Sequence, residues 1–448
     1  MATMDGEHTD ILAVNCHPDD NEATPLLVDD SDDSKRPLRD KNLYNIIILG
    51  IAFCVMFTAF SPTQNLETTI NQTMGSDSLS ILYACLSVSN FVSPLIVLKL
   101  GEKLSLILGT VTYVTYIAAN IYTNAGILYP ASALLGFGAA VLWTAEGAFV
   151  IRCSNEKTLG FHTGLFFALF QVNQIIGNLG TAQLLKAYSD RTLFIILTIA
   201  CASSILIFLL IGNPGSKKND KAKEAMPFQD RLLMTFSILK ERPVQMLIIA
   251  LLYSGMSQAF FFGAFPPLIG KEMMGYVMTV FGVCDALGSV FIGKLSDIIG
   301  RKSLIIVATM ACMGGTIFSY IIDYHISEHK VILYGVCAGL MGIADAGYNT
   351  LLYSLLGTLY PTKGESAAAV FKFVQAIASA AAFLYGPHVN YIQNVIIVNS
   401  FVVPSCLLYI AIEVLYAPKK AVQSEVTVQY VEPVFQSTVQ KSTVGPDI

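Results

Sequence analysis

Charge is scarce in this sequence. Of its 448 residues, 13% are Asp, Glu, Lys or Arg and 54% are hydrophobic, whereas a soluble globular domain carries about 25% charged residues. A chain of this length with so few charges has too little polar surface to remain soluble on its own. The composition therefore argues against a soluble protein and indicates one that crosses a membrane several times.

Motifs for catalysis and for metal or nucleotide binding are also missing. The nine cysteines form no C-x-x-C pair and no cluster with histidine at metal-ligand spacing. We find no G-x-S-x-G, no H-E-x-x-H, no phosphate-binding loop and no dinucleotide fingerprint. No basic cluster suits nucleic acid. We therefore expect no enzymatic activity, no metal, no cofactor and no nucleic-acid partner, and the partner that the composition implies is the lipid bilayer.

Long apolar runs are abundant, and a run of about 20 residues matches the thickness of a bilayer when it is helical. They fall in two sets of six, near 43–62, 78–98, 104–122, 127–150, 161–186 and 192–212, and near 245–267, 272–293, 303–322, 331–353, 366–386 and 395–416. The pattern predicts an all-α membrane protein with twelve transmembrane helices in two six-helix bundles.

The polar segments between and around these runs set the predicted domains. Residues 1–42 form a disordered acidic tail, 43–212 the first bundle, 213–243 a linker, 244–416 the second bundle and 417–448 a second tail. Most of the 27 Lys and Arg residues lie in the tails, the linker and alternate loops. Because basic residues concentrate in cytoplasmic loops, both tails and the linker are predicted to be cytoplasmic.

The first loop supports the same orientation. It contains the chain's single N-x-[ST] sequon, Asn71-Gln72-Thr73, which this topology places outside the cytoplasm. We therefore expect Asn71 to be glycosylated.

A ten-residue motif, "GKLSDIIGRK", lies between the eighth and ninth predicted spans. Gly293 is expected to let two helices approach closely, and Gly300 to permit a tight turn. Asp297 is expected to accept hydrogen bonds from a neighbouring helix end or from Arg301. The other interpretation is a basic loop that merely follows the positive-inside rule, but a match over ten residues favours a conformational motif.

The two halves repeat. Gly101 in "PLIVLKLGEK" precedes Gly300 by 199 positions, although the first copy lacks the glycine and the aspartate of the motif. An offset of 201 superimposes "FQVNQ" on "FKFVQ" and sets Gln171 opposite Lys372. A six-helix unit used twice in parallel places a binding site between the halves at mid-membrane.

These features resemble known proteins. The motif "GKLSDIIGRK" is similar to the signature of the major facilitator superfamily, and "NLYNIIILGIAFCVMFTAF", "AAVLWTAEG" and "VFKFVQAI" resemble the Uncoordinated-93-like family within it. The resemblance implies the major facilitator fold. It also implies two possible activities, since the family's founding description is of an accessory subunit that regulates potassium channels, while other members escort receptors or are treated as orphan transporters.

Four ionisable residues lie well inside predicted spans: Glu146, Asp285, Asp345 and Lys372. A charge at the centre of a spanning helix costs roughly 3 kcal/mol on insertion scales. In the facilitator arrangement their four spans share a central cavity, so carboxylates at the depth of Lys372 offset its cost. Polar residues on neighbouring spans indicate a wet cavity, and we include Gln171, Asn349 and Gln375 in the site.

Two interpretations of these charges stay open. The excess of acids over bases favours a site that couples a proton or ion to a small solute, with Asp345 and Lys372 as the coupled pair. Alternatively, the pair only fixes helix register. The sequence thus predicts a secondary transporter, and its alternative is an accessory subunit of an ion channel or an escort of another membrane protein.

The acidic tail contains a possible sorting signal. "EATPLL" sets Glu22 four residues before Leu26 and Leu27, which is the spacing of an acidic dileucine sorting signal. We therefore expect residence in endolysosomal membranes, with the plasma membrane as the alternative.

Overall fold

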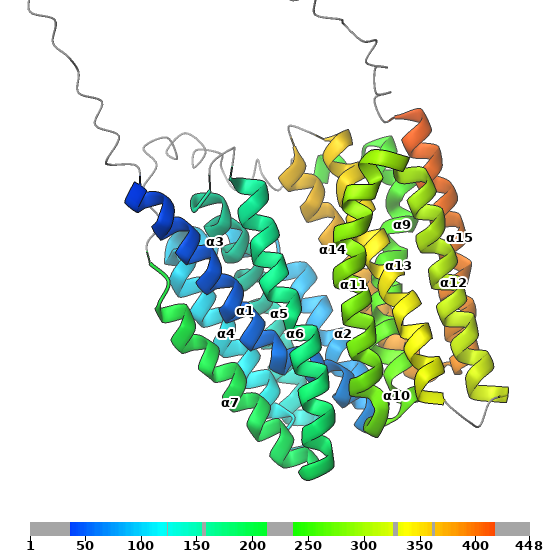
Figure 1. The fold of residues 1–448 in the computed structure, drawn as a ribbon, viewed down its shortest axis with the longest axis horizontal. Helices are drawn as coiled ribbons and strands as arrows, with labels where there is room; N and C mark the ends of the chain where they lie inside the picture. Colours follow the sequence, from blue (N-terminus) through cyan, green and yellow to red (C-terminus); the bar gives the residue numbers. More distant parts are fainter. Residues whose placement is uncertain are drawn as a thin grey trace, which may run out of the picture.

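The computed structural model describes residues 36–122, 124–154, 158–212, 236–325, 330–360 and 363–416. Within these ranges the chain is helical and forms no strand. Figure 1 shows two bundles side by side, a first half (residues 36–212) and a second half (residues 236–416). The beginning of α1 and the end of α15 lie on the same face, at the top of that view.

The first half consists of α1 (Arg36–Ile70), α2 (Gln72–Ser89), α3 (Ser93–Leu100), α4 (Glu102–Ala119), α5 (Ala125–Arg152), α6 (Leu159–Ala187) and α7 (Asp190–Leu209). The second half consists of α9 (Arg242–Ala259), the π-helical turn η3 (Phe260–Ala264), α10 (Phe265–Ile269), α11 (Lys271–Ile299), α12 (Arg301–His325), α13 (Lys330–Leu359), α14 (Gly364–Tyr385), the 3-10 turn η4 (Gly386–His388) and α15 (Tyr391–Leu415).

Every apolar run predicted to span the membrane is helical. Among the described residues, nine helices are long and apolar enough to cross a membrane, and the pair α2 and α3, bent by 70°, makes a tenth. The helices α4 and α6 occupy predicted spans but fall outside this set. The molecule is therefore a helical protein that crosses the membrane many times.

The prediction for the first span was wrong at its end. We expected it to finish near residue 62, where a polar run "SPTQNLETT" begins, but α1 continues to Ile70 with Pro62 inside it. The polar side chains of this run, including Thr63, Asn65 and Glu67, are almost fully buried, and the run packs against helices of both halves. Tertiary packing thus accommodates a stretch that composition alone marks as a loop.

The internal repeat is visible in the helix boundaries. The helices α2 and α4 begin 199 positions before α11 and α12, the offset that the sequence predicts. The residues that precede α4 and α12 are Gly101 and Gly300, with φ of 77° and 84°. Since side chains rarely adopt such angles, glycine is needed at both turns.

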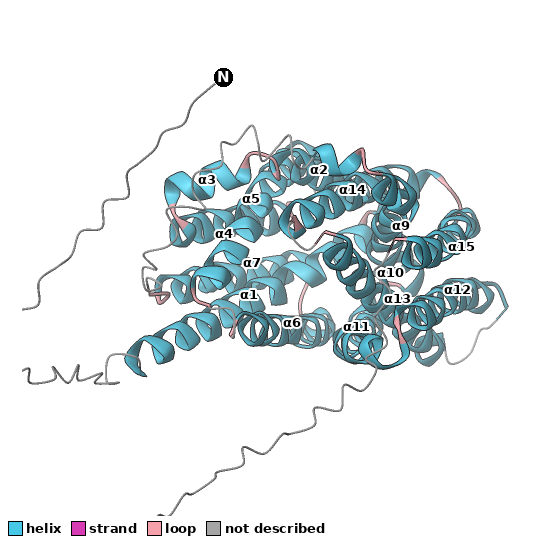
Figure 2. Ribbon diagram, turned by 90° about the horizontal axis from the view of Figure 1, so that it is seen from above, coloured by secondary structure: helices cyan, strands magenta, loops and turns pink. Residues whose placement is uncertain are grey.

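The halves meet along two seams. Viewed from above, α2 lies beside α14 and α6 beside α11 (Figure 2). Glycines allow the second seam, because a Cβ on Gly275 would lie 2.5 Å from the backbone oxygen of Asn178, and one on Gly282 would lie 2.4 Å from the Cβ of Gln174.

Within the second half, α11 and α13 approach most closely at a different glycine from the one that we predicted. Gly293 was expected to mediate a close approach, but a Cβ there would meet only a methyl group of Thr350 at 3.8 Å, an ordinary contact. A Cβ on Gly342 would instead lie 2.4 Å from the backbone oxygen of Phe281. The close approach is therefore at mid-helix rather than in the loop motif.

This contact predicts a large effect of a single methyl group. Gly342→Ala should lower the free energy of unfolding by about 3 kcal/mol, the upper end of the range typical of overpacking. The effect is large because the new methyl group would meet the Phe281 backbone oxygen, which cannot move aside as a side chain can. The matched control is Gly335→Ala on the same helix, where the nearest atom is a Val280 methyl at 4.0 Å. Thermal unfolding in detergent measures both variants. Equal midpoints would contradict the close packing of α11 on α13.

Candidate functional site: a chain of polar side chains between the halves

The predicted central residues of the second half come from two helices. Lys372 and Gln375 lie one turn apart on α14, and Asp345 and Asn349 lie one turn apart on α13. Residues three or four apart share a helix face, so each helix presents two polar groups at one position. The facing pairs meet where α14 packs on α13.

Hydrogen bonds join these four side chains in a line. The Lys372 ammonium donates to Gln375 Oε1 at 2.8 Å, and Gln375 Nε2 donates to Asn349 Oδ1 at 3.2 Å. Asn349 Nδ2 then donates to Asp345 Oδ1 at 3.1 Å. We call this line the central chain. It links a cation to a carboxylate through two amides.

The first half touches the central chain region through Gln171. This residue of α6 donates from Nε2 to Asp285 Oδ2 of α11 at 3.4 Å. Asp285 lies within electrostatic range of Asp345, which in turn lies within range of Lys372. Two carboxylates and one ammonium thus share one region between the halves.

Lys372 makes no direct ion pair with a carboxylate in the described structure, so the coupling of Lys372 with Asp345 stays a prediction. No oxygen of Asp345 or Asp285 lies within 4.0 Å of its ammonium in the described structure. The ammonium instead lies 5.6 Å from the centre of the Tyr353 ring and 5.3 Å from that of Phe371. Gln375, which is 5% exposed, accepts its hydrogen bond. Because the Lys372 side chain is itself exposed, its remaining donors are free for solvent or a ligand.

Glu146 lies apart from the central chain. Its side chain on α5 is 8% exposed and makes no hydrogen bond to any described residue. Nearby Trp143 packs edge-on against Phe53 and Phe170 with ring centres 5.3 and 5.7 Å apart. The tryptophan therefore contributes to the core of the first half, and a role for Glu146 stays a prediction.

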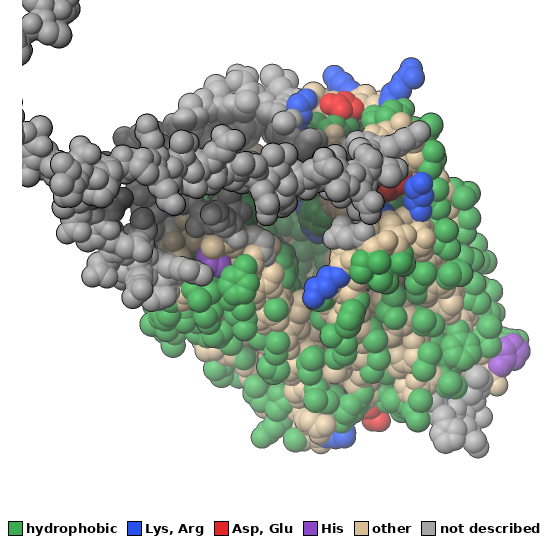
Figure 3. Space-filling view, turned by 45° about the horizontal axis from the view of Figure 1, so that its top comes forward, with side chains coloured by type: hydrophobic (Ala, Val, Ile, Leu, Met, Phe, Trp, Pro, Cys, Tyr) green, Lys and Arg blue, Asp and Glu red, His purple; other side chains and the backbone are tan. Residues whose placement is uncertain are grey.

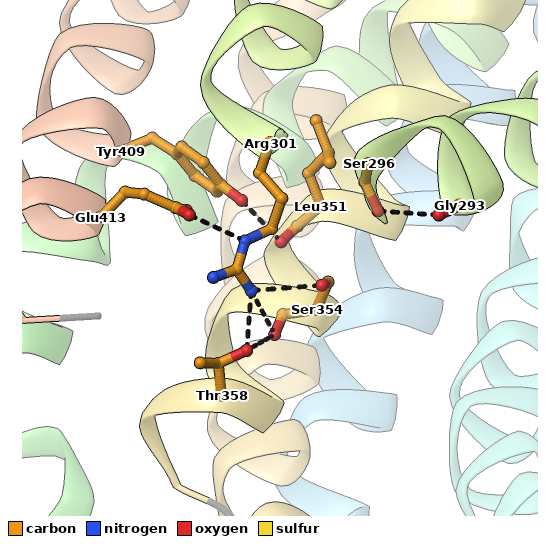
Figure 4. A network of polar contacts seen from close by, with 8 residues as sticks. All are labelled: Gly293, Ser296, Arg301, Leu351, Ser354, Thr358, Tyr409 and Glu413. Carbon is orange, nitrogen blue, oxygen red and sulfur yellow. Dashed lines mark hydrogen bonds and ion pairs between the residues drawn. The ribbon is translucent and has the colours of Figure 1, made fainter. Parts of the chain in front are cut away.

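The loop motif makes a second polar cluster. Arg301, the first residue of α12, donates from Nε to Glu413 on α15 at 3.0 Å and from a terminal nitrogen to Thr358 Oγ1 at 2.7 Å and the Ser354 carbonyl at 3.0 Å on α13 (Figure 4). Arg301 and Glu413 are 15% and 12% exposed. The arginine thus clamps three helices of the second half together.

Sequence reasoning missed the partner of this arginine. This partner is Glu413, whose carboxylate is nearly enclosed and paired. The only available signal was an acid near the end of the last apolar run. Asp297, which we expected to accept from Arg301, has a side chain outside the described part of the structure.

The first half uses different charges at the equivalent place. Glu102, the first residue of α4, accepts two hydrogen bonds from Arg152 at the end of α5, at 2.6 and 2.7 Å. Lys103 donates to the carbonyls of Leu209 and Ile211 at the end of α7, each at 2.7 Å. At the start of α4 the first half thus has the acid of an ion pair, where the start of α12 has the base. Lys103 in addition caps the end of α7.

At the opposite end of the molecule the two halves are latched. Lys271, the first residue of α11, forms an ion pair with Asp190, the first residue of α7. Gln183 Nε2 donates to the Tyr276 hydroxyl at 2.8 Å, and the Lys186 ammonium lies 5.1 Å from the centre of the same ring. These contacts join the halves at this end, whereas the end where α12 begins is hollowed between the halves (Figure 3).

The remaining predicted sites lie elsewhere. Asn71 is exposed in the one-residue turn between α1 and α2, and its Oδ1 accepts from the Met74 amide at 3.1 Å. The glycan-bearing atom would be Nδ2, which this cap leaves free. The sorting residues Glu22, Leu26 and Leu27 lie outside the described residues. No group of three or more candidate metal ligands occurs among the residues that the structure describes.

Comparison with known proteins agrees with this architecture. A family model described as "Ion channel regulatory protein UNC-93" matches residues 66–410. The UNC93-like protein MFSD11 of Xenopus laevis is 31% identical over 407 residues, which cover 77% of this chain and 90% of the relative.

Two solved transporters share the fold. The nucleoside transporter NupG matches with a TM-score of 0.63 at 13% identity, covering 84% of this chain and 100% of that one. A POT family transporter in complex with 5-aminolevulinic acid matches with a TM-score of 0.62 at 14% identity, covering 82% and 96%. At these identities the similarity concerns the fold alone, which is that of the major facilitator transporters.

The Arg301 clamp predicts strong coupling in a double-mutant cycle. Arg301→Gln alone leaves the enclosed Glu413 carboxylate without a counter-charge, which costs about 3–5 kcal/mol, and adding Glu413→Gln should recover most of that loss. The control pair is Lys363 and Glu241, 3.9 Å apart and 43% and 39% exposed, for which less than about 1 kcal/mol is expected. Denaturation of purified protein measures both cycles. A coupling no larger than that of the control pair would refute the clamp.

Proposed function

We propose that this chain, which belongs to the UNC-93 family, is a secondary transporter that moves a small solute across a membrane by alternating access. The observation that carries the proposal is the central chain. Together with the neighbouring Asp285, it sets an exposed ammonium and two carboxylates near the contact of the two halves of a major facilitator fold. Charged groups inside a membrane protein are costly, and they commonly mark the path of a substrate or ion.

The proposed topology has twelve crossings, with α4 and α6 added to the ten helices that qualify by length and hydropathy. The helix α6 has 29 residues and is about 43 Å long at 1.5 Å per residue, which is enough to cross. Its hydropathy is lowered by Gln171, Asn173, Gln174 and Asn178, and two of these, Asn173 and Asn178, are fully buried. Polar residues that face protein rather than lipid do not prevent a helix from spanning.

In this proposal the parts have separate roles. The exposed Lys372 ammonium, which has donors beyond its bond to Gln375, attracts an anionic group of the solute or a counter-ion. Asp345 and Asp285 carry the coupling proton or ion. The Arg301 clamp keeps the second half rigid while it rocks against the first. With both termini in the cytoplasm, the latched end is the outer one, and the structure is the form open to the cytoplasm.

A second candidate function is that of an accessory subunit of an ion channel. The family's description as an ion channel regulatory protein favours it, and so does a groove of about 550 Å³ between α11 and α13. The groove is lined by apolar residues and by two glycines of α13, Gly335 and Gly339. Small residues on an exposed helix face allow another transmembrane helix to approach, so a partner helix would fit here.

The proposed location is the endolysosomal membrane, with the plasma membrane as the alternative. It rests on the spacing of Glu22 from the Leu26-Leu27 pair in the first tail. Adaptors bind such signals in extended, flexible segments.

Reconstitution tests the transport proposal. Purified protein in proteoliposomes should take up at least one solute of a metabolite panel, faster with a pH gradient than without. Lys372→Gln should reduce the rate of this uptake by roughly tenfold or more. If the ammonium stabilises the bound solute during transport by about 1.4 kcal/mol, its loss slows uptake about tenfold.

The matched control removes the same charge elsewhere in the second half. Lys363→Gln takes an exposed lysine outside the central chain, and its uptake should equal that of the unmodified protein. Absence of uptake for the whole panel, together with co-purification of a channel that depends on the α11–α13 groove, would replace the transporter by the accessory subunit.

The orientation has its own test. Asn71→Gln should lower the apparent mass by that of one glycan and leave the thermal midpoint within error, because only the cap to Met74 is altered. A tag inserted at residue 227 should bind antibody only after cells are permeabilised. Binding in intact cells would show that the chain is inserted the other way round.

A further inference from the structure

A carboxyl group that the central chain does not use lies inside the first half. Glu67 of α1 is 4% exposed. Its Oε1 accepts a hydrogen bond from the hydroxyl of Tyr116 on α4. Its Oε2 is buried and meets no partner among the described residues.

The groups that surround Glu67 supply no positive charge. Tyr116 and Asn120 face it from α4, and Ser78 faces it from α2. Tyr83 of α2 is the other titratable group in electrostatic range. The described structure gives Glu67 no ion pair with lysine, arginine or histidine. A carboxylate in such a place would be both uncompensated and desolvated.

The hydroxyl groups near Glu67 have no hydrogen left for its second oxygen. Ser132 on α5 donates to the Leu128 carbonyl at 2.7 Å. The Ser78 hydroxyl lies 2.9 Å from the Ser132 hydroxyl and 3.3 Å from that of Tyr116. Since those two hydroxyls donate elsewhere, Ser78 donates its hydrogen to one of them. Tyr116 has already donated to Oε1. Each hydroxyl has a single hydrogen, and in this arrangement all three are used. Asn120 Nδ2 donates to the Tyr116 carbonyl at 3.2 Å, and Oε2 itself meets no partner among the described residues.

We propose that Glu67 is a proton-binding site of the first half, separate from the central chain, and that Oε2 holds the proton while the halves are latched. The neutral acid removes the uncompensated charge, and its carbonyl oxygen Oε1 accepts from Tyr116. A proton is the ligand that fits, because Glu67 offers a single unpartnered oxygen atom and no described residue faces it with a counter-charge.

The location of Glu67 links this proton to the movement of the halves. The next residue, Thr68, donates to the carbonyl of Phe262 in the second half at 3.1 Å. One turn earlier, Gln64 donates to Tyr83 at 3.4 Å, and the Tyr83 ring stacks on Phe383 of the second half with centres 5.5 Å apart. Opening this end breaks both contacts and admits water beside Glu67, where the proton is released.

Infrared difference spectroscopy on the full chain in lipid nanodiscs tests the site directly. At neutral pH, Glu67→Gln should remove one carbonyl stretching band of a protonated carboxylic acid and leave the carboxylate bands unchanged. The control is Glu102→Gln, whose carboxylate is paired with Arg152, and it should remove carboxylate intensity instead. Loss of carboxylate intensity in Glu67→Gln would overturn the proposal.

A second variant keeps the test independent of folding. Tyr116→Phe retains Glu67 but removes the hydrogen bond to Oε1, so the acid band should persist and shift to higher frequency. A band that does not move would show that the acid observed is not Glu67. These spectra do not depend on transport. If the acid band is assigned to Glu67 and no solute moves, the proposed function fails while the proton site stands.

The transport role rests on the proposed function. With a transported solute in hand, Glu67→Gln should retain solute exchange at equal pH on both sides and lose the acceleration by a pH gradient. Unchanged acceleration would show that Glu67 binds a proton without coupling it to transport.

Discussion

Inside a membrane there is no water to bind a polar side chain, so each buried donor or acceptor must find its partner within the protein. This constraint explains the arrangement of most polar residues described above, and Glu67 Oε2 is an exception. Arg301 reaches both α13 and α15, and Lys103 caps α7. Each cation thereby joins helices that apolar contacts alone would leave free to slide. The polar clusters stiffen each half from within.

Between the halves the same constraint is met differently. The α6–α11 seam depends on glycines that bring backbone against side chain at Gly275 and Gly282, and few side-chain hydrogen bonds cross it. Gln171 and Asp285 form a long bond at 3.4 Å, and Lys271 and Asp190 are partly exposed. Such contacts are weak compared with the Arg301 clamp. A structure that is stiff within each half and weakly joined between them is suited to rigid-body rocking.

Much of the fold was predictable from the sequence because the signals were long or repeated. Each apolar run in the sequence corresponds to a helix, or to consecutive helices, in the structure. The 199-residue offset correctly relates the turns at Gly101 and Gly300. The extension of α1 was not predictable, because the run around Glu67 has the composition of a loop. Only its burial by the other helices, a tertiary effect, makes it helical and places an acid in the core.

For the candidate site the sequence predicted the residues but not their partners. Depth along a helix can be counted, so Lys372 and Asp345 were correctly placed on neighbouring helices. Which atoms meet depends on the rotation of each helix and on side-chain length, and these are set by packing. Gln375, only one turn from Lys372, accepts the hydrogen bond of its ammonium, and no carboxylate of the described residues does so.

The two amides in this line have a consequence for coupling. A direct ion pair of Lys372 with Asp345 would neutralise both groups and leave little reason to bind a further charge. With Gln375 and Asn349 between them, the ammonium stays exposed and the carboxylate stays within electrostatic range. In the proposed transporter, an anion at Lys372 and a proton at Asp345 would favour each other, since each neutralises the charge that the other site faces. The spacing, rather than the charges alone, is what makes the central chain suitable for coupled binding.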